Sequence, residues 1–232
     1  MFTTIFYQPI YNLLIFLYNL VPGKDLGVSI ILITFIIRLV LYPFSKKAIK
    51  SQRELQTIQP EIEKIKEKYK DDKEKMAPEL MALYKEKKIN PFSSCLPTLI
   101  QLPFLIALYR VFLNGITKDN SSANLLYPFI QNPGHLNAIA FGFIDLASKN
   151  WIIAILAGLA QFWQSKMLMG SSKQTGMSQM MTNQMIYFMP IFTIIIGGNL
   201  PAGLTLYWLF TTIFSIIQQY IVLGFRKKTA QV

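Results

Sequence analysis

Long apolar stretches alternate along the chain with one strongly charged stretch at residues 45–90. An α-helix of 18 residues is roughly 27 Å long, which is enough to cross the hydrocarbon core of a bilayer. The pattern therefore predicts an all-α integral membrane protein with five transmembrane helices, at residues 26–44, 95–114, 151–168, 184–198 and 201–223. The connections that this assigns are an outer loop at 115–150, a cytoplasmic loop at 169–183 and a cytoplasmic tail at 224–232.

The charged stretch carries its own helical pattern. Apolar side chains recur at intervals of three and four residues, at Leu55, Ile58, Ile62, Ile65 and Tyr69 and again at Met76, Leu80, Leu83 and Tyr84. Asp71 and Asp72 between the two series are typical of a turn. One apolar seam on each of two charged helices predicts a basic, antiparallel helical hairpin in the cytoplasm.

Residues 1–22 hold no charged side chain, but Gln8, Pro9, Asn12 and Asn19 interrupt their apolar residues. The remaining apolar positions follow helical spacing, which favours an interfacial amphipathic helix on the outer surface of the membrane. A further membrane span is the alternative interpretation of this segment.

Composition and charge placement agree with a membrane protein. Hydrophobic residues make up 52% of the 232 residues and charged residues 15%, and the formal net charge is +11. The segment 45–90 alone holds 13 lysines and arginines. Because lysines and arginines concentrate on the cytoplasmic side of membrane proteins, the segment 45–90 is assigned to the cytoplasm. With five spans, this assignment predicts an outer amino terminus and a cytoplasmic carboxyl terminus. The positive charge therefore indicates topology, and no DNA partner is expected.

Arg38 lies inside the first predicted span. A charge at that depth costs at least about 2.5 to 3.5 kcal/mol unless water or a partner offsets it. Thr34 precedes Arg38 by four residues, so the two share one face of the helix. This face is expected to border protein or a wet cavity; the alternative is that Arg38 extends to the cytoplasmic headgroups.

Polar residues also line single faces of other predicted spans. Gln101 lies on the second span and Gln161 on the third, and the fifth carries a stripe of Thr205, Trp208, Thr212, Ser215 and Gln219. Stripes on several helices favour one shared wet cavity over separate packing devices. No span holds Asp or Glu, His135 is the single histidine, and there is no metal-ligand cluster or phosphate-binding loop. We therefore expect neither an enzyme nor a cofactor.

Three ordered motifs stand at the ends of predicted spans. They are Ile33 to Lys47 with Arg38 and Pro43, Asn90-Pro91-Phe92-Ser93-Ser94-Cys95-Leu96-Pro97 continuing to Tyr109, and Pro201-Ala202-Gly203-Leu204-Thr205-Leu206-Tyr207-Trp208 with Gln218-Gln219-Tyr220. Together they resemble the motifs of the YidC/Oxa/Alb family of membrane protein insertases. The resemblance implies the short, five-span bacterial type, in the plasma (inner) membrane, with a hydrophilic groove open to the cytoplasm and lipid. The groove arginine of the family falls on Arg38, its polar neighbour on Thr34, and the client-contacting aromatic on Trp208.

The implied activity is that of an insertase and chaperone in protein transport. Such a protein moves short polar segments of nascent proteins part-way across the bilayer and releases their apolar helices sideways into lipid. Nascent single- or double-span membrane proteins and the lipid bilayer are the implied partners; the ribosome, the signal recognition receptor and the Sec translocon are further candidates. The rival hypothesis is a small anion channel with Arg38 as its filter.

Overall fold

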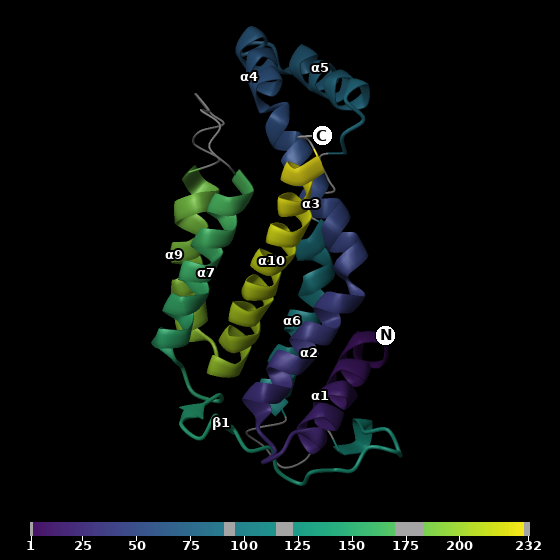
Figure 1. The fold of residues 1–232 in the computed structure, drawn as a ribbon, viewed down its shortest axis with the longest axis vertical. Helices are drawn as coiled ribbons and strands as arrows, with labels where there is room; N and C mark the ends of the chain where they lie inside the picture. The colour runs from purple at the N-terminus through teal and green to yellow at the C-terminus, as the bar shows by residue number, and fades with distance from the viewer. Residues whose placement is uncertain (1, 91–95, 115–122, 170–182, 230–232) are drawn as a thin grey trace.

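A computed structural model describes residues 2–90, 96–114, 123–169 and 183–229 of the chain (Figure 1). The fold is mostly helical. Its elements are η1 (Thr3–Tyr7), α1 (Gln8–Leu20), α2 (Leu26–Val40), α3 (Tyr42–Thr57), α4 (Gln59–Lys68), α5 (Lys73–Glu86), α6 (Leu96–Asn114), η3 (Ala123–Leu125), β1 (Ile139–Ala140), β2 (Ile144–Asp145), α7 (Trp151–Met169), η4 (Gln184–Phe188), α9 (Met189–Asn199) and α10 (Ala202–Thr229).

Helix α10 lies between two groups of helices. It packs against α7 on one side and against α2 on the other, while α7 packs on α9, and α1 packs on α2 and α6 (Figure 1). The main apolar core draws on both groups; its fully buried members include Leu14, Ile30, Leu108 and Ala157. Because lipid tails are as apolar as these side chains, close van der Waals packing is what such a core contributes to holding membrane helices together.

The predicted first span is divided into α2 and α3, which meet at an angle of 69°. Leu41 separates them, and Pro43 follows in the first turn of α3. Proline has no backbone N–H, and its ring collides with the carbonyl four residues earlier, so a straight helix through Leu39 and Pro43 is unfavourable. As a result α3 turns across the bundle instead of continuing the line of α2.

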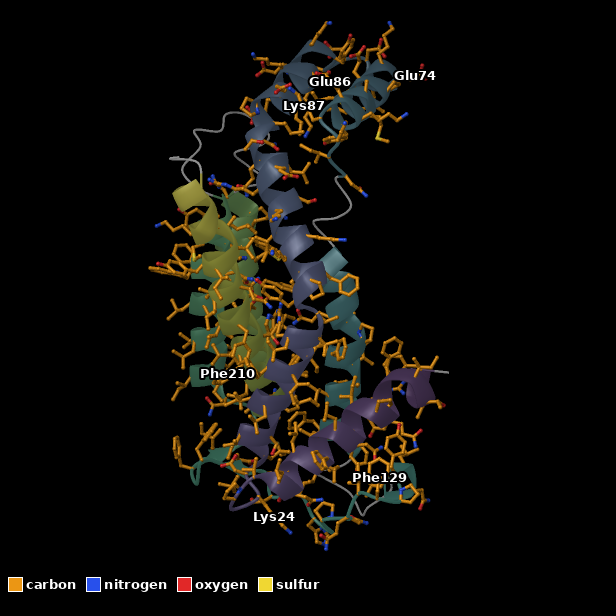
Figure 2. All side chains as sticks on the ribbon, turned by 45° about the vertical axis from the view of Figure 1, so that its right-hand side comes forward. Lys24, Glu74, Glu86, Lys87, Phe129 and Phe210 are labelled. Atoms are coloured by element: carbon orange, nitrogen blue, oxygen red, sulfur yellow. The ribbon has the colours of Figure 1, made fainter. Side chains whose placement is uncertain are left out.

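Helices α4 and α5 pack against each other beyond α3. Ile58, Ile62 and Leu83 are their buried residues, and the side chains packed around these are Leu55, Ile65, Leu80, Tyr84 and Ile89. Tyr69 and Met76 of the predicted seams are not part of this core. We call the pair α4–α5 the hairpin and the adjacent end of the bundle the hairpin end, where Figure 2 shows Lys87, Glu74 and Glu86.

Two ionic contacts hold the hairpin. Lys87 Nζ lies 2.9 Å from a carboxylate oxygen of Glu61, and this bond raises the pKa of Lys87. The Asp72 carboxylate accepts a bond from the backbone N–H of Lys75 at 3.1 Å and thereby caps α5. The side chain of Lys75 also pairs with it at 2.8 Å, and the bonds to Lys75 lower the pKa of Asp72.

The opposite end of the bundle is covered by residues 123–150, which we call the strap, and we call this end the strap end. The strap contains η3 and the short antiparallel pair β1–β2. Asn12 of α1 donates to the carbonyl of Leu125 at 2.8 Å and accepts from the N–H of Tyr127 at 2.7 Å. The Asp25 carboxylate accepts from Val28 N at the start of α2 and from Phe141 N in the strap.

The strap also reaches α10. Ala202 N donates to the carbonyl of Ser148 at 2.8 Å, and Gly203 N donates to the carbonyl of Leu146 at 3.0 Å. The strap thus bonds to α1 and to the starts of α2 and α10, and so joins one group of helices to the helix between the two groups.

Among the described residues, one helix is long and apolar enough to cross a membrane, and it is Ala202–Gly224 of α10. A second such span exists if the bent pair α2 and α3 counts as one. The apolar stretches Gln101–Phe112 and Gln184–Asn199 are shorter. Helix α1, the predicted interfacial helix, packs obliquely against the strap end of α2 (Figure 1).

Candidate functional site

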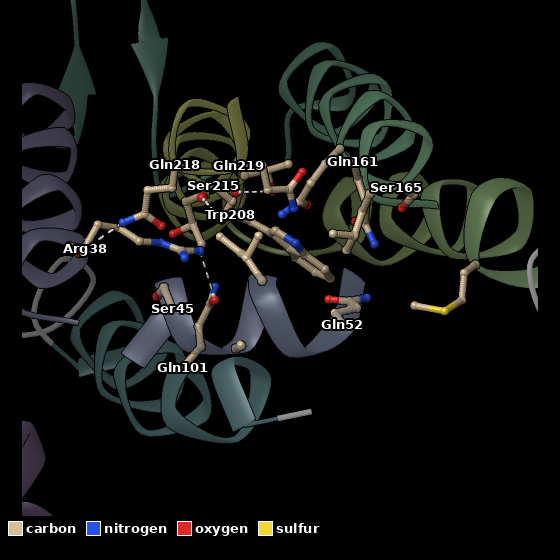
Figure 3. Close-up of a pocket in the computed structure, with 17 residues that line it drawn as sticks. Arg38, Ser45, Gln52, Gln101, Gln161, Ser165, Trp208, Ser215, Gln218 and Gln219 are labelled. Atoms are coloured by element: carbon tan, nitrogen blue, oxygen red, sulfur yellow. Dashed lines mark hydrogen bonds between the residues drawn. The ribbon is translucent and has the colours of Figure 1, made fainter. Parts of the chain in front are cut away.

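A polar pocket lies at the hairpin end, between α10, α7, α6 and the α2–α3 bend (Figure 3). Its volume is about 270 Å³, well above the space that a single water needs. The residues that line it are Arg38, Ser45, Ala48, Ile49, Gln52, Gln101, Gln161, Gln164, Ser165, Leu168, Met185, Trp208, Thr211, Thr212, Ser215, Gln218 and Gln219.

Arg38 is the one charged residue of this lining among the described residues. Its guanidinium Nη2 donates to Gln101 Oε1 of α6 at 3.3 Å. Its backbone carbonyl, close to the α2–α3 break, accepts from Gln218 Nε2 at 3.3 Å. Arg38 is thus bonded to both sides of the pocket, and a guanidinium with five N–H donors keeps most of them for other partners.

The face of α10 toward the pocket combines one aromatic ring with hydroxyls. Thr212 Oγ1 donates to the carbonyl of Trp208 at 2.9 Å, and Ser215 Oγ donates to that of Thr211 at 2.9 Å. Because these hydroxyl protons are bonded within the helix, the oxygens present lone pairs to their surroundings. The Trp208 ring, half-buried, forms the broad apolar part of the wall (Figure 3).

Helix α7 supplies the opposite wall. Gln161 Oε1 accepts a bond from Thr193 Oγ1 of α9, which fixes the amide and joins α7 to α9. Gln164 and Ser165 follow on the same helix. At the hairpin end, Arg53 of α3 donates to the carbonyl of Leu168 at 3.3 Å, so α3 is bonded to the last turn of α7.

The pocket brings together Arg38, Gln101, Gln161, Trp208, Thr212 and Ser215 of the predicted site. Thr34 and Thr205 are not in its lining. Thr34 is buried and donates to the carbonyl of Ile30 at 2.5 Å, and Thr205 donates to that of Gly197 at 2.8 Å. Both hydroxyls thus take part in helix packing, which is what small polar residues of membrane helices commonly do.

Gln219 of the predicted stripe also lies in the lining, and the lining holds further polar residues that the predicted site did not include: Ser45, Gln52, Gln164, Ser165, Thr211 and Gln218. The spacing of the α10 stripe indicates Gln219, and Thr211 and Gln218 flank that stripe. Ser45 and Gln52 had no such signal, because they belong to α3, which turns into the pocket only through the break after Val40.

The comparisons with known proteins agree on one family. Residues 16–229 match the family model described as 60Kd inner membrane protein. A relative from Fusobacterium nucleatum subsp. nucleatum, named membrane protein insertase YidC, is 38% identical over 199 residues, which are 86% of each chain. The chain belongs to the YidC family. Its members are named as insertases, so an insertase and not an enzyme is indicated, and the family is one of bacterial inner-membrane proteins.

Longer YidC proteins share only part of their length with this chain. The relative from Francisella tularensis subsp. novicida is 35% identical over 198 residues, which are 84% of this chain and 32% of that protein. A crystal structure described as an active YidC insertase with the first transmembrane domain resolved is similar with a TM-score of 0.64 and 27% identity. That similarity covers 94% of this chain and 46% of the other.

The described lining of the pocket is polar and carries one positive charge. It offers one cation, several neutral amides and hydroxyls, and no acidic side chain in its described lining. The described residues hold no group of three or more His, Cys, Asp or Glu that fits a metal ion. Such a surface is suited to hydrating and hydrogen-bonding polar groups.

Proposed function

We propose that this YidC-family chain inserts membrane proteins by receiving the short polar segment of a nascent client in the Arg38 pocket. The observation that carries this proposal is a polar pocket with one cation inside an otherwise apolar bundle. A client helix enters lipid favourably, but the polar segment ahead of it does not. A wet pocket at the hairpin end shortens the dry path that this segment must cross.

In this proposal the hairpin end faces the cytoplasm and the strap end faces outside. The 13 lysines and arginines at 45–90 support that orientation, because basic segments stay in the cytoplasm. The five spans are then α2 with the start of α3, α6, α7, η4 with α9, and α10. The basic hairpin is where we place contacts with the ribosome, the signal recognition receptor and the Sec translocon.

Release of the client helix is proposed to occur sideways, along α7 and α9. Both helices carry large apolar side chains that are exposed, including Leu159, Trp163, Ile191 and Ile195. These side chains fit a lipid-facing surface. A client helix that leaves the pocket along this surface exchanges protein contacts for lipid contacts at little cost.

Reconstitution of the purified chain in liposomes tests the proposal. The client is a single-span protein with a short acidic amino-terminal tail, and protection of that tail from added protease measures insertion. We expect protection well above that in empty liposomes, with no chloride flux. Chloride flux without tail protection would support the anion channel and contradict the insertase.

A further inference from the structure

Glutamine is the most frequent polar residue of the pocket. The lining includes Gln52 of α3, Gln101 of α6, Gln161 and Gln164 of α7, and Gln218 and Gln219 of α10. A glutamine amide offers a carbonyl oxygen and an NH₂ group, which are the same kinds of group that a peptide bond offers. A wall of neutral amides favours a partner with many amide groups over one with a single strong charge.

Two of these glutamines have a carbonyl oxygen that is buried without a partner. Gln218 Oε1 and Gln219 Oε1 are both buried, and no hydrogen bond reaches either from the described residues. The side chains are 8% and 3% exposed. Buried polar groups are normally paired, because leaving one unpaired costs free energy. Two neighbouring exceptions on one face of α10 therefore indicate that a partner is missing.

The orientation of the Gln218 amide is set by its surroundings. Its nitrogen donates to the carbonyl of Arg38, which lies next to the α2–α3 break. An amide whose nitrogen is bonded in this way keeps its oxygen as a free acceptor. Figure 3 shows Gln218 on the side of Arg38 and Gln219 nearer to Gln161. The two acceptors thus occupy adjacent positions along the pocket wall, and they need a donor.

We propose that Gln218 and Gln219 accept hydrogen bonds from backbone N–H groups of the client's polar segment. The inference rests on the proposed function and adds what the pocket recognises, which is peptide backbone more than any particular side chain. A segment without secondary structure carries unpaired N–H and C=O groups that are costly away from water. The glutamines satisfy its N–H groups, and the guanidinium of Arg38 is available for its carbonyls.

Backbone recognition has a consequence for the range of clients. Every residue except proline carries a backbone N–H, so the pocket accepts neutral tails of varied sequence, and Arg38 adds a preference for acidic ones. A tail without N–H groups gains nothing from the glutamines, whatever its charge. Comparing tails with and without N–H groups therefore separates the contribution of the glutamines from that of Arg38.

The test uses synthetic single-span clients that differ only in the tail. One tail is a neutral Gly/Ser segment, and the other replaces its glycines by sarcosine and its serines by N-methylserine, so that every backbone N–H of the tail becomes an N-methyl group. Insertion into liposomes with the wild-type chain is compared with insertion by Gln219→Met, which keeps the side-chain length and removes the amide. Gln184→Met is the matched control, because Gln184 is exposed at the start of η4 and does not line the pocket.

For the Gly/Ser tail we expect Gln219→Met to lower the insertion rate about fivefold, which corresponds to one lost hydrogen bond. For the sarcosine tail we expect the same substitution to change the rate by less than about twofold. Gln184→Met should match the wild-type chain with both tails. If Gln219→Met does not fold, as judged by thermal unfolding, Gln218→Met is tested with the same two tails.

Equal effects of Gln219→Met on the two tails would overturn the inference, and so would no effect on either. Such a result would mean that water, or another group of the chain, pairs with the amide oxygens. These failures are distinct from failure of the proposed function, in which the wild-type chain itself inserts neither client above the level of empty liposomes.

Discussion

The two ends of the bundle use polar side chains in opposite ways. At the strap end, Asn12 bonds to two backbone groups of the strap, and Asp25 bonds to one in α2 and one in the strap, so both join helices to the strap. At the hairpin end, Gln218 and Gln219 leave buried oxygens without a partner in the described structure. The first arrangement stabilises one closed conformation. In our proposal, the second keeps binding capacity for the polar segment of a client.

The two ends also differ in how closely their elements pack. A Cβ on Gly27 would lie 2.6 Å from the Cβ of Ala140 in the strap, and one on Gly203 would overlap the ring of Phe112. These glycines allow backbones to approach where nothing larger fits. The hairpin end instead contains the pocket of about 270 Å³. This difference supports the proposal that a client segment enters at the hairpin end.

The largest expected effect comes from a substitution at the strap end. Asn12→Leu keeps the approximate size of the side chain but leaves the N–H of Tyr127 without its partner and removes one donor from the carbonyl of Leu125. We expect the free energy of unfolding to fall by about 2 to 3 kcal/mol, because a buried unpaired group costs about 1 to 3 kcal/mol. Thermal unfolding in detergent measures it.

Gln219→Met is the matched control for that substitution. It also replaces a buried amide by an apolar side chain, but it removes an oxygen that has no partner. Stability should therefore be unchanged within about 0.5 kcal/mol, or rise. A loss as large as that from Asn12→Leu would show that both ends are equally closed and would remove the contrast between them.

The next effect concerns Arg38. Arg38→Ala is expected to lower insertion of clients with acidic tails about tenfold, as loss of one charge-assisted interaction predicts. Arg38→Lys should retain much of the activity, because a positive potential matters here more than a forked geometry. Equal loss in both variants, with normal folding, would instead assign Arg38 a geometric role through Gln101.

The smallest effect lies in the hairpin. The folded-state pKa of Asp72 is lowered by its bonds to Lys75, so the stability that it contributes is present above its unfolded value of 3.8. That contribution is lost as pH falls through the lower folded value. Spin labels in the first turn of α5 should report fraying of that turn below pH 3.8, and Asp72→Asn should weaken that response. An identical response in the variant would assign the change to other groups.

The helical fold class could be predicted from the sequence, and the family match confirms it. Periodicity also indicates which face of α10 is polar. It does not tell what lies opposite each position, so Thr205, which bonds to Gly197, looks the same in the sequence as Ser215, which lines the pocket. The predicted first span runs unbroken through Pro43, so neither the break between α2 and α3 nor its direction was predicted, and that direction decides whether Gln52 reaches the pocket.

The glutamines of the pocket lining and the hydrogen bonds of the strap could be recognised as groups only in the tertiary structure. The six glutamines come from four helices, and a single glutamine on α3 or α6 has no pattern of its own. The strap bonds depend on loop backbone conformation, which hydrophobic periodicity does not describe. Side-chain bonds such as that of Asn19 to the carbonyl of Gln131 therefore had no signal in the sequence.

Photo-crosslinking to a stalled client tests the central claim most directly, that a client occupies the pocket at the hairpin end. A photoreactive side chain at Trp208 faces the pocket, and one at Phe210 lies about 160° away around α10 (Figure 2). The account predicts strong labelling of the client's polar segment from position 208 and weak labelling from 210. Comparable labelling from both positions would contradict it.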